Sequence, residues 1–152
     1  VAGLGQHTPF TVSAVEKAFP GYTVIPFTDP ATGTATFEVR PSGSDTARFL
    51  IEPDWTRGYV AAVRSRDPGV RGPAGEVIGQ ATFADLPLDQ RGLCGDAVTV
   101  EGGREFSCPD PAAPGAFARV YRFTPSSSSV ETLIPDLEAA KLVELRYVAS
   151  AP

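Results

Sequence analysis

The stretch AVTVEGGREFSC, residues 97–108, has the pattern of a β-hairpin. Two runs rich in β-branched and aromatic residues flank Gly102-Gly103, and glycine readily adopts the positive φ angles of a two-residue hairpin turn. In this register Glu101 lies opposite Arg104, which is a favourable cross-strand pair. The stretch therefore predicts two antiparallel strands, and the sequence on either side continues the pattern.

Short strands separated by turn residues recur on both sides of this hairpin. We expect them at residues 22–27, 34–40, 47–52, 58–66, 77–83, 117–123 and 142–148. Clusters of Gly, Pro, Asp and Ser lie between them, as turns require. This spacing is typical of all-β proteins, so the sequence predicts a mainly β fold, either an antiparallel β-sandwich or an open barrel.

Two short helices interrupt the β pattern. Apolar residues at helical spacing follow Thr11, which is a suitable N-cap, and Pro20-Gly21 ends this first helix. The residues around Pro135 allow a second short helix before the last strand, because proline is favoured near helix starts.

The 152 residues, with 42% apolar and 9% aromatic residues, are enough to build a hydrophobic core. No internal repeat or linker is visible, so we expect a single globular β domain over residues 1–152. Residues 1–7 are expected to be flexible, because terminal segments fray. The polar residues 124–130 are expected to form a surface loop.

Charge and motif content exclude several classes of function. The net charge is −5 and the basic residues form no run, so nucleic-acid binding is not expected. No apolar stretch reaches the roughly 18 residues of a membrane-spanning helix. The only histidine is His7, and no zinc ligand set, EF-hand or phosphate-binding loop is visible. We therefore expect no metal and no cofactor.

Cys94 and Cys108 are the only cysteines, and an even number favours a disulfide in an exported protein. In the hairpin register above, Ala97 lies opposite Cys108, and Cys94 lies three residues, or about 10 Å, farther along the strand. A disulfide needs Cα atoms about 5.5 Å apart. We expect the disulfide, with the backbone at Gly95-Asp96 bending back toward the hairpin.

The chain contains no methionine and begins at Val1, so we expect that a leading segment has been removed. That segment is a signal peptide, a lipid-bearing tether or a single residue. Together with the paired cysteines, this predicts a periplasmic or secreted protein. A lipid anchor on a removed N-terminal cysteine stays open as an alternative.

Two acidic residues beside the only tryptophan form the clearest candidate site. Glu52-Pro53-Asp54-Trp55 is followed by Arg57, and glycosidases use two carboxyl groups, often beside an aromatic platform. Catalysis, ligand or partner contact, and a structural role with Trp55 covering the core are all open. We take Glu52, Asp54, Trp55 and Arg57 as candidate contacts for a ligand or partner.

Several features occur in the same order in a known family. They are Thr8-Pro9-Phe10-Thr11 and Phe19-Pro20-Gly21-Tyr22 around the first helix, then Phe49-Leu50-Ile51-Glu52-Pro53, Gly75-Glu76-Val77-Ile78-Gly79, and Cys94-Gly95 and Cys108-Pro109 around the hairpin. The order resembles the envelope-stress-regulated lipoproteins of Gram-negative bacteria, a YfeY-like domain of unknown function. The resemblance implies a mainly β domain exported to the periplasm and tethered by lipid. It implies no catalytic residues.

Since no catalytic motif is recognisable, the sequence favours a non-catalytic exported envelope or periplasmic domain. We expect it to bind a protein or a cell-envelope component and to have no enzyme activity. One alternative is a hydrolase that uses the carboxylates near Trp55. Another is a small enzyme inhibitor that inserts a rigid loop, for which residues 109–115, pinned by Cys108, are the candidate.

Overall fold

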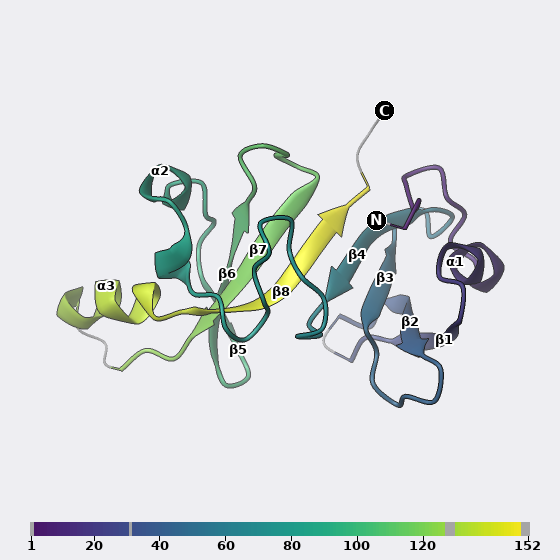
Figure 1. The fold of residues 1–152 in the computed structure, drawn as a ribbon, viewed down its shortest axis with the longest axis horizontal. Coiled ribbons are helices and arrows are strands. Elements are labelled where there is room, and N and C mark those ends of the chain that lie inside the picture. Colours follow the sequence, from purple (N-terminus) through teal and green to yellow (C-terminus); the bar gives the residue numbers. More distant parts are fainter. Residues whose placement is uncertain (1, 31, 127–129, 150–152) are drawn as a thin grey trace. The chain divides into compact units, whose positions relative to one another are not determined.

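The computed structural model describes residues 2–30, 32–126 and 130–149, and strands form most of its regular structure (Figure 1). The chain divides into two compact units. Unit 1 consists of Val1–Asp67 and Arg146–Pro152, and unit 2 consists of Pro68–Leu145. The expectation of a single domain over residues 1–152 stays a prediction.

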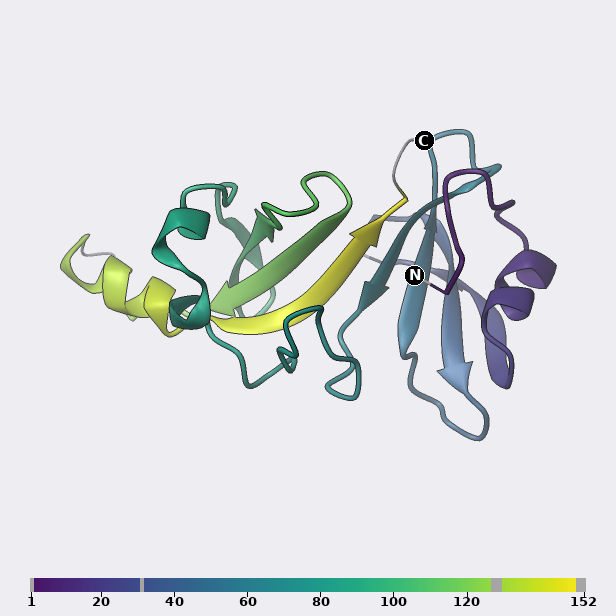
Figure 2. The same cartoon turned by 45° about the horizontal axis from the view of Figure 1, so that its top comes forward.

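Unit 1 is an antiparallel meander with one helix. Its strands, hydrogen-bonded in chain order, are β1 (Tyr22–Thr28), β2 (Ala35–Pro41), β3 (Phe49–Pro53) and β4 (Val60–Ser65). The end of β8 (Lys141–Val148) belongs to the same unit, and just after it the N–H of Ala149 donates to the carbonyl of Ala61 at 2.8 Å. The helix α1 (Val12–Ala18) lies against this sheet (Figure 2).

The helix α1 forms where the sequence predicted it. The hydroxyl of Thr11 accepts the N–H of Ala14 at 3.2 Å, and Gly21 turns the chain after the helix with a φ of +82°. Leu4, within the segment 1–7 expected to be flexible, packs against the core, whereas Val1 lies outside the described residues. The core combines one face of α1 with alternate strand residues, namely Val15, Phe19, Val24, Val39, Ile51, Val60 and Val63.

Unit 2 combines the other strands of the antiparallel sheet with short helices. The strand order is β5 (Val98–Val100), β6 (Gly103–Pro109), β7 (Phe117–Phe123) and then β8. The helical elements are η1 (Phe83–Asp85), α2 (Leu88–Arg91) and α3 (Val130–Glu138). Its core is an aromatic cluster with ring centroids 5.1 to 6.0 Å apart, formed by Phe83, Phe106, Tyr121 and Phe123.

The predicted hairpin is present, but its predicted register is wrong by two residues. Val100 pairs with Gly103, so the turn is Glu101-Gly102 rather than Gly102-Gly103. Gly103 lies in β6, where a Cβ would stand only 2.6 Å from the carbonyl oxygen of Phe123. The second glycine therefore allows β7 to approach closely, which sequence spacing alone did not reveal.

The strand predicted over residues 77–83 is not formed. Gly79 adopts a φ of +86°, and the N–H of Ala81 donates back to the carbonyl of Val77 at 3.0 Å. The chain therefore turns in the middle of the expected strand and enters η1. A glycine inside an apolar run was the signal for this break.

The remaining expectations for the fold are largely met. A mainly β, antiparallel fold with a short N-terminal helix and a short helix before the last strand is confirmed. The strands form one eight-stranded sheet, and its edge strands β1 and β5 have no second neighbour among the described residues, so the sheet does not close into a barrel. The helix α3 begins at Val130, so Pro135 lies inside it rather than near its start.

The expected surface loop over residues 124–130 is only partly described. Residues 124–126 are exposed, residues 127–129 lie outside the described residues, and Val130 is the first residue of α3. No helix in the described ranges is long and apolar enough to cross a membrane.

Candidate functional site

The turn between β3 and β4 carries three of the four residues that the sequence nominated. Asp54, Trp55 and Arg57 lie in this turn, and Glu52 lies near the end of β3. The four residues therefore share one hairpin of unit 1. Their side chains have different surroundings, which separate their roles.

Asp54 organises the turn with its own side chain. Its Oδ1 accepts the hydroxyl of Thr56 at 2.7 Å and the N–H of Tyr59 at 3.4 Å. The bond from Thr56, together with backbone N–H groups, outweighs desolvation and holds the pKa of Asp54 below its usual value. Arg57 closes the turn with a φ of +62°, which is uncommon for a residue with a side chain.

The N-terminal segment braces the same turn from outside. The N–H of Phe10 donates to the carbonyl of Gly58, and the N–H of Val60 donates to the carbonyl of Thr8, both at 2.9 Å. The turn is thus held both by its own side chains and by a neighbouring segment of chain. Such a turn presents its outer residues in a defined position.

Trp55 projects into solvent from this turn and is 93% exposed. The interpretation in which Trp55 covers the core is therefore wrong. Tyr59, at the other side of the turn, is also exposed. Trp and Tyr are among the residues most enriched at binding hot spots, because they combine a large apolar body with a polar group.

Glu52 has a structural role. Its Oε1 pairs with the Nε of Arg64, and its Oε2 accepts a hydrogen bond from Arg146 at 3.0 Å. Arg64 lies in β4 and Arg146 in the final part of β8, so one carboxylate joins three strands of unit 1.

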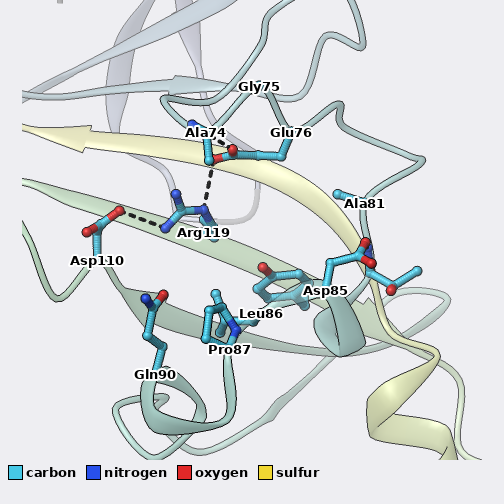
Figure 3. Close-up of a pocket in the computed structure, with 12 residues that line it drawn as sticks. Ala74, Gly75, Glu76, Ala81, Asp85, Leu86, Pro87, Gln90, Asp110 and Arg119 are labelled. Atoms are coloured by element: carbon cyan, nitrogen blue, oxygen red, sulfur yellow. Dashed lines mark hydrogen bonds and ion pairs between the residues drawn. The ribbon is translucent and has the colours of Figure 1, made fainter.

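Unit 2 contains a pocket of about 500 Å³ that sequence reasoning did not indicate (Figure 3). Arg119 lies between two acids, and its Nε donates to Glu76 and its Nη1 to Asp110, each at 2.8 Å. The backbone holds these acids as well, because the N–H of Ala74 donates to Glu76 and the N–H of Ala112 donates to Asp110. The network is therefore rigid before any ligand binds.

The electrostatics of this network follow from burial and pairing. Burial alone would raise the pKa of Asp110, but the N–H of Ala112 and the guanidinium of Arg119 outweigh it and lower that pKa. Burial would lower the pKa of Arg119, but its bonds to Asp110 and Glu76 raise it instead. Arg119 and Asp110 are thus both charged at neutral pH.

Tyr121 lines the same pocket two residues along β7. Burial raises the pKa of its hydroxyl to about 12, so the group is neutral at physiological pH. The opposite wall comes from η1 and the start of α2, with Asp85, Leu86, Pro87 and Gln90.

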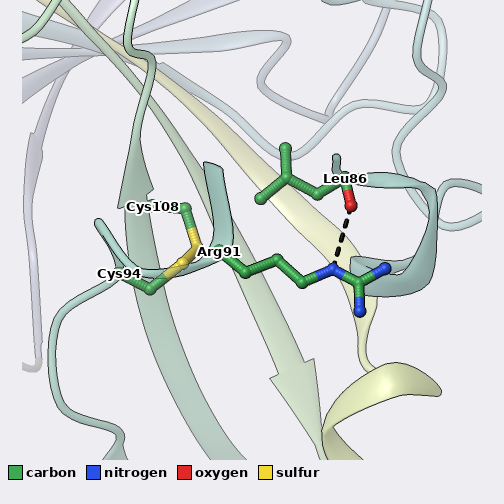
Figure 4. Close-up of a disulfide and its surroundings, with 4 residues drawn as sticks. All are labelled: Leu86, Arg91, Cys94 and Cys108. Atoms are coloured by element: carbon green, nitrogen blue, oxygen red, sulfur yellow. Dashed lines mark hydrogen bonds between the residues drawn. A yellow bond between two sulfur atoms is a disulfide. The ribbon is translucent and has the colours of Figure 1, made fainter. Parts of the chain in front are cut away.

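The Cys94–Cys108 disulfide anchors the segment that forms this opposite wall. The predicted disulfide is confirmed, with Cα atoms 4.1 Å apart, and the N–H of Gly95 donates to the backbone of β6 at 2.9 Å. Arg91, three residues before Cys94, donates to the carbonyl of the pocket residue Leu86 at 2.9 Å (Figure 4). The shifted hairpin register brings the two cysteines close to opposite positions, which removes the difficulty that the predicted register created.

The sequence did contain one signal for the pocket. Alternate residues of β7 face inward, and these are Phe117, Arg119, Tyr121 and Phe123. Arg119 is charged on an otherwise aromatic face, and a buried charge requires a partner. The partners themselves lie 43 and 9 residues away along the chain, so spacing could not name them.

These units and their strand orders define a mainly β fold of a kind known from solved structures. The chain is similar to the crystal structure of the uncharacterized protein yfeY from Escherichia coli, with a TM-score of 0.65 and 19% identity over 96% of this chain and 95% of that chain. No family model and no curated protein matches the chain significantly. Likeness at this identity shows the fold alone, so the YfeY-like fold is confirmed and the rest of the family resemblance is not.

Proposed function

We propose that this protein is a non-catalytic domain exported to the bacterial cell envelope, periplasmic or secreted, where it binds a protein or a cell-envelope component. The observation that carries the proposal is Trp55, which is 93% exposed on a hydrogen-bonded turn. A rigid turn suits binding because little conformational entropy is lost when a partner covers it.

Trp55 offers enough apolar area to anchor a contact. A tryptophan side chain buries roughly 150–250 Å², which at about 25 cal/mol per Å² corresponds to an upper limit of about 4–6 kcal/mol. Hot-spot residues typically account for about 2 kcal/mol or more. Truncating Trp55 should therefore weaken binding about 30-fold.

The carboxylates near Trp55 favour binding over hydrolysis. Glu52 is held between Arg64 and Arg146, and Asp54 is bonded within its own turn. A glycosidase acid needs a raised pKa, whereas the pKa of Asp54 is lowered. A hydrolase based on these residues is the weaker candidate.

The inhibitor alternative has a similar weakness. The loop over residues 109–115 is braced, because Asp110 accepts the N–H of Ala112 and bonds to Arg119. Its exposed side chains are only proline and alanine, so it presents no large anchor comparable to Trp55.

Export is supported by the disulfide, because such bonds persist in oxidising compartments. A lipid tether on a removed N-terminal cysteine, and regulation by envelope stress, are further parts of the proposal. Both rest on the family resemblance.

Co-sedimentation with isolated outer-membrane vesicles and with peptidoglycan sacculi tests the proposal. The wild type, Trp55→Ala and Leu88→Ala are compared, because Leu88 is also a largely exposed apolar residue but lies in unit 2. We expect the wild type and Leu88→Ala to bind one of these fractions, and Trp55→Ala to bind it about 30-fold more weakly. Protease treatment of the vesicles distinguishes a protein partner from lipid.

Two results would contradict the proposal. If Trp55→Ala binds as tightly as the wild type, the Trp55 turn is not the binding site. If the wild type binds neither fraction, the protein does not bind an envelope component.

A further inference from the structure

We propose that the pocket of unit 2 is a binding site for a small organic cation that carries an ammonium group. Its volume of about 500 Å³ lies within the usual range for small-molecule sites. The pocket belongs to unit 2 and the Trp55 turn to unit 1, so this proposal is independent of the proposed function.

Tyr121 places an unpaired hydrogen-bonding group in this pocket. The residue is only 3% exposed, yet its hydroxyl has no hydrogen-bond partner among the described residues. The hydroxyl interacts electrostatically with Arg119, Glu76 and Asp85, which all line the pocket. Because the hydroxyl opens onto the pocket rather than into the closed core, it is free to bond a molecule held there.

Charge selects the class of that molecule. Glu76, Asp85 and Asp110 contribute three carboxylates to the lining, whereas Arg119 contributes the one guanidinium, so negative charge is in excess. Arg119 already donates to Glu76 and Asp110, which leaves the pocket poorly suited to an anion.

The acceptors have capacity for a further donor. The Oε2 of Glu76 accepts the N–H of Ala74 at 2.9 Å, and the Oδ1 of Asp110 accepts the N–H of Ala112 at 2.8 Å. A carboxylate oxygen can accept two hydrogen bonds. An ammonium group carries only donors, so it complements these carboxylates and the Tyr121 hydroxyl.

The lining favours an organic cation over a metal ion. Among the described residues, no three His, Cys, Asp or Glu side chains gather closely enough to hold a metal ion. Leu86 and Pro87 add an apolar wall opposite Arg119 (Figure 3). A hydrocarbon segment attached to the ammonium group would pack against that wall.

NMR titration of the ¹⁵N-labelled full chain tests the proposal with three probes of similar length. They are 1,4-diaminobutane, neutral 1,4-butanediol and anionic succinate. We expect saturable shifts with the diamine at the backbone amides of Ala74, Gln90 and Ala112, with a Kd on the order of 1 mM. No shift with the diamine, or equal saturable shifts with the diol or succinate, would overturn the proposal.

Two conservative variants assign the binding to named groups. Tyr121→Phe keeps the ring in the core and removes the hydroxyl, and Asp85→Asn keeps an acceptor for the N–H of Thr82 and removes the charge. Each should weaken diamine binding about 5- to 10-fold. Tyr59→Phe and Asp89→Asn make the same changes outside the pocket and should retain wild-type affinity. Unchanged affinity in both pocket variants, or equal losses in the controls, would refute the assignment.

Discussion

Replacing Arg119 with methionine would leave two largely buried carboxylates without their shared cation. The side chains of Arg119, Glu76 and Asp110 are 9%, 11% and 16% exposed, and the guanidinium donates to each acid at 2.8 Å. Removing one partner of a buried ion pair costs about 3–5 kcal/mol. Because backbone N–H groups still hold both acids, we expect a loss of about 3 kcal/mol, or a fall in Tm of about 6–12 °C at this chain length.

The loss should depend on pH in a definite direction. In the wild type the pKa of Asp110 is lowered, so its ionised form contributes stability above the unfolded pKa of about 3.9 and that stability is lost as the pH falls through the folded pKa. In the variant, Arg119 no longer offsets the effect of burial, so the pKa of Asp110 is higher than in the wild type. Protonation then removes the unpaired charge of Asp110 and reduces the loss of stability. The difference in free energy of unfolding between wild type and Arg119→Met should therefore shrink between about pH 5 and pH 3.

Arg71→Met is the control for the loss of one positive charge from unit 2. Arg71 is exposed, whereas the side chain of Arg119 is only 9% exposed. An exposed charge contributes about 1 kcal/mol or less, so this variant should lose little stability. The pair of variants separates the effect of burial from the effect of removing one positive charge.

Urea unfolding followed by far-UV circular dichroism measures both variants across this pH range. Fluorescence is a poor probe here, because Trp55 is already exposed in the folded protein. A loss below about 1 kcal/mol for Arg119→Met at pH 7 would refute the buried-network argument. A loss that stays constant on acidification would refute the role of Asp110.

Three further predictions concern the disulfide, the turn and the hairpin. Replacing both Cys94 and Cys108 with alanine opens a loop with a sequence separation of 14 and should cost about 3 kcal/mol in urea unfolding, and a cost near zero would contradict the loop-entropy argument. Trp55→Ala should change the free energy of unfolding by less than about 0.5 kcal/mol, and acrylamide should quench wild-type fluorescence almost as well as that of free tryptophan, whereas strong protection would show a covered side chain. Gly103→Ala should lower the Tm more than Gly102→Ala, because only the former meets a backbone oxygen at 2.6 Å, and the reverse order would contradict the observed register.

Local patterns predicted the elements that depend on neighbouring residues. Thr11 caps a helix within its own turn, and alternation in 117–123 marks a half-buried strand, so both could be read directly from the sequence. The pattern around Gly102-Gly103 indicated the hairpin correctly but not its register, because both Gly102-Gly103 and Glu101-Gly102 can form a two-residue turn. Gly79 broke an expected strand, since a short apolar run does not show which of its residues must turn.

The candidate site was likewise predictable only in part from the sequence. Glu52, Asp54 and Trp55 were nominated because they are adjacent in sequence, yet adjacency could not tell the paired Glu52 from the exposed Trp55. That difference depends on Arg146, which lies 94 residues from Glu52 along the chain.

By itself the sequence determined the mainly β composition, the capped helix and the pairing of Cys94 with Cys108. These features depend on short-range periodicity, turn chemistry and the presence of only two thiols. The tertiary structure alone decided the hairpin register, the exposure of Trp55 and the meeting of Glu76 with Arg119 across 43 residues. Burial and pairing are properties of groups brought together by packing, so residues distant in the chain acquire their chemistry only when the fold places them in contact.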